Sequence, residues 1–134
     1  MDIFKTYATD DVKEQDGIWR ELGDGKILVA RAFNTQHAKY FSTQVEAHKR
    51  LLDSKTPEAD KMSDKIVIDA MSKFVFLGFE NLQYNGKPLE NNLETRVMLL
   101  QHKDFRRVVN EIAQDHNNYL MYQEEEATKN SAST

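Results

Sequence analysis

The sequence of 134 residues contains no cysteine, which excludes disulfide bonds, thiolate metal sites and thiol nucleophiles. Glycine and proline are also few, with 5 and 2 residues, so we expect no long loops. Positive charge is not in excess either, because 18 basic side chains stand against 22 acidic ones and the formal net charge is −4. A nucleic-acid surface usually requires a clustered basic excess, so this composition argues against nucleic acid as a partner.

Long apolar runs are missing as well. The run FVFLGF at residues 74–79 is far shorter than the roughly 20 residues that a helix needs to cross a bilayer. Residues 1–16 are polar and acidic and lack the apolar core of a signal peptide. With 40% hydrophobic and 30% charged residues, the composition is typical of a soluble globular protein. We therefore expect one domain with one core, inside the cell and without membrane contact.

A β-hairpin is predicted within GIWRELGDGKILVARAF at residues 17–33. The pair Asp24-Gly25 is typical of a type I′ turn, which needs positive φ at both central positions. With this turn, Leu22 would lie opposite Ile27 on one face of the ribbon. Because a lone hairpin is marginally stable in water, we expect it to pack against another element.

Helical spacing of apolar residues predicts four helices. The first three begin at capping residues, and Asp104 near the start of the fourth suits the helix dipole. The second helix is apolar on most sides, so we place it at the centre of the core. Between the second and third helices, Asn85-Gly86 indicates a turn. The expected helices run from Asn34 or Thr35 to about Asp53, from the cap Thr56 through Pro57 to Leu77 with Gly78 as the stop, from Asn91 or Asn92 to a break near His102, and from Asp104 to about Tyr122.

These patterns together predict a mainly α fold, in which about four helices pack as a small bundle with an N-terminal β-hairpin. Residues 1–16 are expected to be a partly ordered lead-in, and residues 17–122 the helical domain. Residues 123–134 are polar and rich in small side chains, so we predict a disordered tail there.

A catalytic, metal or cofactor site is not apparent in the sequence. No histidine stands at helical ligand spacing from another histidine, and there is no HExxH pattern. The pair of glycines in GDG lacks the spacing of a phosphate-binding loop. We therefore predict no catalytic residue, no metal site and no cofactor. The histidines are His37, His48, His102 and His116.

Aromatic and methionine side chains are the best candidates for recognition of another protein. They crowd at two places, and only some of them can face a single core. Surplus aromatic and methionine surface often serves protein recognition, although a local core is the simpler interpretation. The predicted partner-binding residues are Phe33, Tyr40, Phe41, Tyr119, Met121 and Tyr122.

The order of these signals resembles the tail assembly chaperones of long-tailed phages and prophages. The resemblance covers roughly residues 17–122. It rests on the hairpin segment WRELGDGKILVARAFN, a helical pair followed by glycine and an aromatic residue at 78–79, the Asn-Gly turn, a capped helix with paired leucines, and DFRRVVNEIAQDHNNY. The family often has tryptophan where Phe79 stands, and a Ser/Thr-Pro start where residues 90–92 stand, and these departures bear on the subfamily more than on the fold.

The resemblance implies a function in tail morphogenesis. Such chaperones bind the long, aggregation-prone tape measure protein and keep it soluble before the tail tube polymerises around it. A longer form, made by ribosomal frameshifting, is thought to recruit tail tube protein, and the polar tail of this chain fits the shorter product. The expectations that follow are self-association along the client, a location in the host cytoplasm, and absence from the mature virion.

Two alternatives remain at this point. The chain could be another phage morphogenesis component, such as a head–tail connector or tail completion protein, which would stay in the particle. It could also be a small hydrolase that uses His48 or His116, which would require a pocket with a neighbouring carboxylate.

Overall fold

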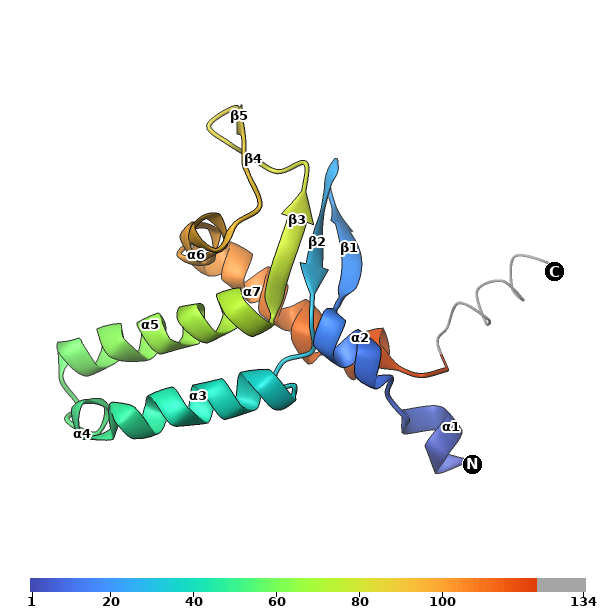
Figure 1. Ribbon diagram of the computed structural model, residues 1–134, viewed down its shortest axis with the longest axis horizontal. Helices are drawn as coiled ribbons and strands as arrows, with labels where there is room; N and C mark the ends of the chain where they lie inside the picture. Colours follow the sequence, from blue (N-terminus) through green and yellow to red (C-terminus); the bar gives the residue numbers. More distant parts are fainter. Residues whose placement is uncertain (123–134) are drawn as a thin grey trace.

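The computed structural model describes residues 1–122, which form a mixed α/β fold with seven α-helices, one 3-10 helix and two small antiparallel sheets (Figure 1). The prediction of a mainly α bundle of about four helices was therefore wrong. The helices are Ile3–Tyr7 (α1), Asp11–Asp16 (α2), Thr35–Ala47 (α3), Lys49–Leu52 (α4), Pro57–Phe74 (α5), Leu93–Leu100 (α6), Lys103–Gln114 (α7) and the 3-10 helix His116–Tyr119 (η1). The strands are Ile18–Leu22 (β1), Gly25–Val29 (β2), Phe76–Glu80 (β3), Gln83–Tyr84 (β4) and Lys87–Pro88 (β5).

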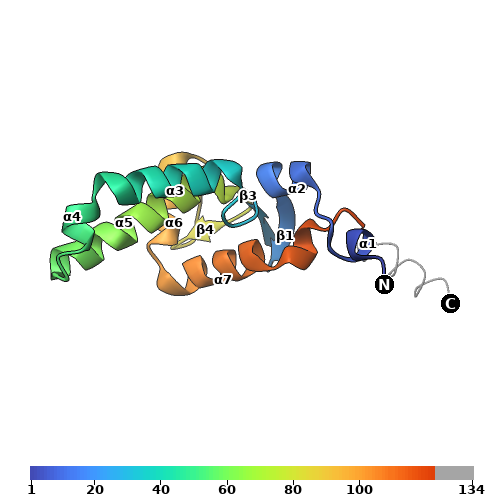
Figure 2. The same ribbon diagram turned by 90° about the horizontal axis from the view of Figure 1, so that it is seen from below.

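The helices and the larger sheet occupy different parts of the molecule. Helices α3 and α5 run antiparallel as a long pair that extends away from the sheet (Figure 1). Seen from below, α7 lies on the opposite side of α5 from α3 (Figure 2). The strand order in the larger sheet is β1-β2-β3, and β4 and β5 form a separate ribbon. The N-terminal helix α1 lies at the end of the molecule opposite the α4 turn.

The largest error of the sequence prediction concerns β3. Residues 75–77 were predicted as the end of the second helix, with Gly78 as its stop, but α5 ends at Phe74 and Phe76 begins a strand. A short continuous apolar run has no period that distinguishes a helix from a buried strand. Gly78 lies within this strand opposite Leu28, at a position where a Cβ atom would come within 2.7 Å of Nδ2 of Asn91.

The predicted hairpin is present as β1 and β2, but its register differs from the prediction. Leu22 lies opposite Gly25 and not opposite Ile27. The turn is Gly23-Asp24, and of these two only Gly23 has positive φ, at 63°, which is the pattern of a type II′ turn. Because the pairing moves by two residues, the same side chains share a face, and Ile27 remains fully buried.

Three predicted helix caps are confirmed. The side chains of Asn34, Thr56 and Asn92 accept hydrogen bonds from backbone N–H groups in the first turns of α3, α5 and α6. The first predicted helix is interrupted at His48, where α3 ends and the short α4 begins. These caps satisfy backbone donors that a helix start leaves without partners.

The fourth predicted helix ends earlier than expected. Helix α7 stops at Gln114, and Asp115 adopts extended backbone angles with ψ 102°. The Asp115 side chain accepts a hydrogen bond from the Asn117 N–H at 3.0 Å and so opens η1. An Asx cap of this kind competes with helix continuation, and it turns the chain toward the N-terminal segment.

One hydrophobic core joins the sheet to the helices. Side chains from β2 and β3 pack against α5, α6 and α7, and Phe76 stacks with Phe79 at a centroid distance of 6.0 Å. Complete burial of one such side chain contributes about 1.5–3 kcal/mol, so this cluster is the main source of stability. The buried members are Ile27, Val29, Ile68, Met71, Val75, Phe76, Phe79, Leu99, Leu100, Val109 and Ala113.

The N-terminal segment, predicted as a partly ordered lead-in, forms α1 and α2 and pairs with the chain after η1. The Asp10 N–H donates to the Tyr119 carbonyl at 2.8 Å, and the Met121 N–H donates to the Ala8 carbonyl at 2.9 Å. Thr9 and Leu120 form an antiparallel bridge between these two segments. Residues near both chain ends are therefore brought together. The disordered tail predicted for residues 123–134 lies outside the described residues.

Candidate protein-binding surface

Exposed apolar side chains gather where residues near the two chain ends meet. They come from α1 and from the two residues after Leu120, and we call this surface the terminal patch. Their exposed fractions are 60% for Ile3, 59% for Phe4, 51% for Tyr7, 44% for Met121 and 47% for Tyr122. Clusters of exposed large apolar residues on a folded protein mark interaction sites more often than isolated ones do.

Ring contacts connect the two segments of the terminal patch. The rings of Phe4 and Tyr122 meet edge to face at a centroid distance of 6.1 Å. The ring of Tyr7 stacks on the imidazole of His116 at 5.9 Å. Together with the backbone bridge at Thr9, these contacts hold α1 beside η1 and the segment that follows it.

Helix α1 does not contribute to the core. It has five residues, and none of them is buried. An isolated helix shorter than about 12–15 residues is marginal in water, so the cap from Asp2 and the ring contacts are what hold it. The cap is the Asp2 carboxylate, which accepts from the Lys5 N–H at 3.2 Å. The packing of the core therefore does not explain why α1 carries three large apolar side chains.

A second aromatic group lies at the start of α3, and we call it the α3 cluster. It consists of Phe33, His37 and Phe41, with centroid distances of 4.8 Å from Phe33 to His37 and 5.7 Å from Phe33 to Phe41. Phe33 is 58% exposed and has φ 57°, in the left-handed region. Its N–H donates to Nδ1 of the buried His37 at 2.7 Å, and burial lowers the pKa of His37. This hydrogen bond is part of what holds the unusual backbone at Phe33.

Tyr40 belongs to neither group. Its ring packs on Phe74 of α5 at a centroid distance of 5.3 Å. Its hydroxyl donates to the Asp69 carboxylate and accepts from Nζ of Lys73 at 2.8 Å. The hydrogen bond to Tyr40 is the main reason that the pKa of Lys73 is raised. Tyr40 thus joins α3 to α5.

Tyr119 lies in the interior. It is fully buried, and its hydroxyl donates to the Val29 carbonyl at 3.1 Å. Burial also raises the pKa of Tyr119, because the charged phenolate is disfavoured away from water. Of the six residues predicted to bind a partner, Met121 and Tyr122 are in the terminal patch, Phe33 and Phe41 are in the α3 cluster, and Tyr40 and Tyr119 link elements of the fold.

Sequence reasoning missed the three α1 members of the terminal patch. The acidic character and weak overall periodicity of residues 1–16 predict only a lead-in. The signal that was available is the spacing of Ile3, Phe4 and Tyr7, which places them on one side of a helix that begins after the cap Asp2.

The histidines named for the hydrolase alternative have other surroundings. Nδ1 of His48 lies 3.0 Å from the Gln44 carbonyl oxygen. Nε2 of His116 is buried and has no hydrogen-bond partner among the described residues, and the imidazole stacks against the ring of Tyr7. Among residues 1–122, no ion pair joins a histidine to a carboxylate, and no group of three acidic or histidine side chains is placed to hold a metal ion. No helix in this part of the chain could span a membrane.

Hollows on the surface are shallow and lined by charged side chains. One of about 420 Å³ lies between α5 and α6, and its lining includes Asp64, Lys65 and Ile68. A smaller one of about 220 Å³ lies between α5 and α7, with Met71 and Arg106 in its lining. Small-molecule sites usually have mostly hydrophobic and aromatic linings with few polar groups, whereas about half of the residues that line each of these hollows are charged.

Comparison with known proteins adds no relative, since no protein-family model, curated protein or solved structure matches the chain.

Proposed function

We propose that this protein is a phage tail assembly chaperone, which binds the tape measure protein and keeps it soluble during tail morphogenesis. Two independent considerations support the proposal. The first is the resemblance of residues 17–122 to that family. The second, which carries the argument for protein binding, is the terminal patch, because it exposes five large apolar side chains that the core does not use.

The size of the terminal patch favours weak binding by each copy. About half of each of its five side chains is exposed, from 44% to 60%. Complete burial of a large apolar side chain contributes about 1.5–3 kcal/mol, so the exposed halves together offer roughly 5 kcal/mol. The entropic cost of association is of similar size. Stable coverage of a long client therefore requires several copies of this protein bound along one client molecule, so that multivalent binding (avidity) replaces the affinity of a single site.

Co-expression with the tape measure protein tests the proposal. The soluble fraction of the client is compared with and without the chain, and then with the variant Phe4→Ala/Tyr122→Ala. Tyr84→Ala is a matched control, because Tyr84 is also exposed, at 42%, but lies in the β4–β5 ribbon. The wild type and the control should keep the client soluble, and the double variant should not. A client that stays insoluble with the wild type would refute the proposal.

The same proposal includes where the protein acts and which other partners it has. A longer frameshifted form would recruit tail tube protein, and copies of the shorter form would self-associate along the client in the host cytoplasm. A chaperone leaves before the particle matures, whereas a head–tail connector or a tail completion protein remains. Mass spectrometry of purified particles separates these possibilities, and a stoichiometric amount of the chain in the particle would favour the structural component.

A further inference from the structure

We infer that the hollow between α5 and α7 binds an acidic segment of a partner protein, which places one large apolar side chain in the hollow and carboxylates beside it. This inference goes beyond the proposed function, whose protein-binding surface is the terminal patch. It draws on the sign of the charges in the lining, on the apolar groups from α5 and on the size of the hollow. We call this site the α5–α7 hollow, and its lining consists of Val67, Met71, Lys103, Arg106, Arg107 and Asn110.

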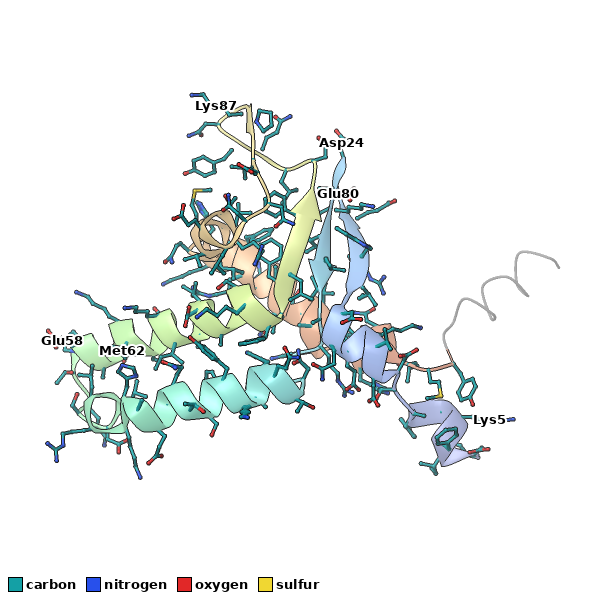
Figure 3. The ribbon with its side chains drawn as sticks, in the orientation of Figure 1. Lys5, Asp24, Glu58, Met62, Glu80 and Lys87 are labelled. Atoms are coloured by element: carbon teal, nitrogen blue, oxygen red, sulfur yellow. The ribbon has the colours of Figure 1, made fainter. Side chains whose placement is uncertain are left out.

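The α5–α7 hollow is separate from the terminal patch. Its residue Lys103 begins α7, whereas the patch includes the residues that follow η1, after the other end of that helix. Figure 3 shows Lys5, which lies on α1 beside the patch, at one end of the molecule, and α5 extends away from that end toward Met62 and Glu58. A variant of one surface therefore leaves the other unchanged.

The charged side chains that line the α5–α7 hollow are all basic, namely Lys103, Arg106 and Arg107. The hollow between α5 and α6 differs, because Asp64 and Asp69 balance the lysines in its lining. The α5 aspartates nearest in sequence to the apolar floor thus line the other hollow. On a chain whose formal net charge is −4, a lining with only positive charge is a local feature, and it favours an anionic partner over a cationic one.

Two of the three cations have no carboxylate partner within residues 1–122. Lys103 and Arg106 form no ion pair there. Nη1 of Arg106 donates instead to the Leu100 carbonyl at 3.1 Å. This hydrogen bond holds the guanidinium in place, and a guanidinium has further N–H donors for a carboxylate. Lys103 and Arg106 both lie in the first turn of α7, where the helix dipole disfavours cations.

The third cation, Arg107, has only exposed partners. It pairs with Asp104 at 3.4 Å and with Glu111 at 3.6 Å, and its side chain is 64% exposed. Exposed ion pairs of this kind contribute little and are screened by salt. Neither carboxylate belongs to the lining of the α5–α7 hollow. The positive charge of the lining is therefore available to a carboxylate from outside.

The apolar part of the lining comes from α5. Val67 is partly buried and Met71 is 4% exposed, and they lie one turn apart on the same side of the helix. The hollow has a volume of about 220 Å³, and an apolar cavity of about 150 Å³ holds benzene. One aromatic or branched side chain of a partner therefore fits. Methionine also adapts its shape to different apolar partners.

These features favour a polypeptide over a nucleic acid. Proteins that bind single-stranded nucleic acid stack its bases on aromatic side chains, and the lining of the α5–α7 hollow contains none. Phosphates would also leave the apolar floor without a partner. A segment in which aspartate or glutamate flanks one large apolar residue satisfies both the floor and the cations, and clustered arginines are a common means of recognising acidic motifs.

Three labelled peptides of equal length test the inference. The first carries one phenylalanine flanked by glutamates, the second has glutamines in place of the glutamates, and the third has alanine in place of the phenylalanine. Fluorescence anisotropy measures their binding to the full chain at low and at high salt. The first peptide should bind at least about tenfold more tightly than either of the others at low salt. Its advantage over the glutamine peptide should shrink at high salt, because screening weakens exposed charges.

Charge variants of the chain locate the binding site. Lys103→Gln/Arg107→Gln should lower the affinity for the glutamate peptide several-fold and reduce its dependence on salt. The matched control Lys61→Gln/Lys65→Gln removes the same charge from the hollow between α5 and α6, and it should leave the affinity unchanged. Circular dichroism of each variant confirms that the fold is intact.

A variant of the apolar floor separates the two contributions. Val67→Thr replaces one methyl group of the floor by a hydroxyl, so it should weaken binding of the glutamate peptide and leave the salt dependence as it is in the wild type. Val12→Thr makes the same replacement on α2, where the side chain is 65% exposed, and it should have no effect.

Each remaining outcome would overturn the inference. Equal affinities for the glutamate and glutamine peptides, or equal effects of the two charge variants, would show that these cations do not select the partner. A single-stranded oligonucleotide that binds more tightly than the glutamate peptide, and that Lys103→Gln/Arg107→Gln weakens, would assign the hollow to nucleic acid. A lower mass of that variant in solution would assign it to a second copy of the chain.

The terminal-patch variant Phe4→Ala/Tyr122→Ala distinguishes this inference from the proposed function. It should bind the glutamate peptide as tightly as the wild type does. Loss of binding in this variant would place the peptide on the terminal patch and overturn the inference. Because none of these measurements uses the tape measure protein, a negative result leaves the proposed function standing.

Discussion

The backbone at Phe33 gives a sharp test of the α3 cluster. Phe33 has φ 57°, a conformation that costs an ordinary L-residue roughly 1–2 kcal/mol. Two variants separate this strain from the contacts of the ring. Phe33→Ala removes the ring and keeps the strain, whereas Phe33→Gly removes both. We therefore expect the glycine variant to be more stable than the alanine variant, against the usual order of these residues.

The expected magnitudes follow from the local contacts. Loss of the ring contacts with His37 and Phe41 costs about 0.5–1.5 kcal/mol for each pair, at the low end because Phe33 is 58% exposed. Phe33→Ala should thus be roughly 1 kcal/mol less stable than the wild type. Glycine loses about 0.5–1 kcal/mol through the greater freedom of the unfolded chain, so after relief of the strain its advantage over alanine is about 0.5–1 kcal/mol.

Urea unfolding measures the three proteins. With a slope of about 1.5–2 kcal/mol per molar urea, the midpoint of the glycine variant should lie roughly 0.3–0.7 M higher than that of the alanine variant. A glycine variant equal to or less stable than alanine would refute the strained conformation at Phe33. The glycine variant also tests whether the α3 cluster binds the client. If the client binds through the terminal patch, Phe33→Gly should still keep the tape measure protein soluble.

Two further predictions concern pH and packing. Nδ1 of His37 accepts the Phe33 N–H, which only a neutral imidazole can do, and burial lowers its pKa. The hydrogen bond to neutral His37 therefore stabilises the fold above the unfolded pKa of about 6.5, and this stabilisation is lost as the pH falls below that value. Between about pH 7.5 and 5.5, the urea midpoint of His37→Gln should fall less than that of the wild type. Equal decreases in the two midpoints would contradict this. Gly25→Ala places a Cβ atom 2.6 Å from a backbone carbonyl oxygen, whereas the Cβ atom of Gly78→Ala meets only the movable end of the Asn91 side chain. Calorimetry should therefore show that the free energy of unfolding falls by at least about 2 kcal/mol for Gly25→Ala and by under about 1 kcal/mol for Gly78→Ala. Similar losses for the two variants would contradict the close approach of the Asn81 carbonyl oxygen to Gly25.

Local signals predicted the helix starts well. Asn34, Thr56 and Asn92 cap the helices that follow them. A side-chain oxygen just before an apolar stripe can accept a hydrogen bond from a free backbone N–H group of the first turn, which makes this signal reliable. Helix ends were predicted less well. The predicted fourth helix was extended past Gln114, although Asp115 offers its own side chain to the backbone two residues later.

The third strand of the sheet could not be predicted from local sequence signals, for a physical reason. Residues 74–79 form a short apolar and aromatic run that fits a buried strand as well as a helix. Only pairing with β2, about fifty residues earlier in the chain, decides between the two. The register of the hairpin depended on which of two glycines flanking Asp24 enters the turn. Both arrangements keep Ile27 inside, so the hydrophobic pattern does not distinguish them.

The candidate surface was predicted in part. Met121 and Tyr122 were named from the surplus of aromatic residues, but their neighbours in space come from α1, at the other end of the sequence. Contact between the segments depends on the Thr9–Leu120 bridge and on the early end of α7. The aromatic pattern alone also did not separate Tyr119, which is fully buried, from its exposed neighbours.

Hydrogen–deuterium exchange on the complex with the tape measure protein tests the central claim most directly. In the free chain, the amides of α1 should exchange rapidly, because this five-residue helix buries no side chain. Binding of the client at the terminal patch should slow exchange at residues 3–9 and 119–122 and leave the α4 turn unchanged. Unchanged exchange in α1, with protection at the α3 cluster or elsewhere, would contradict the account.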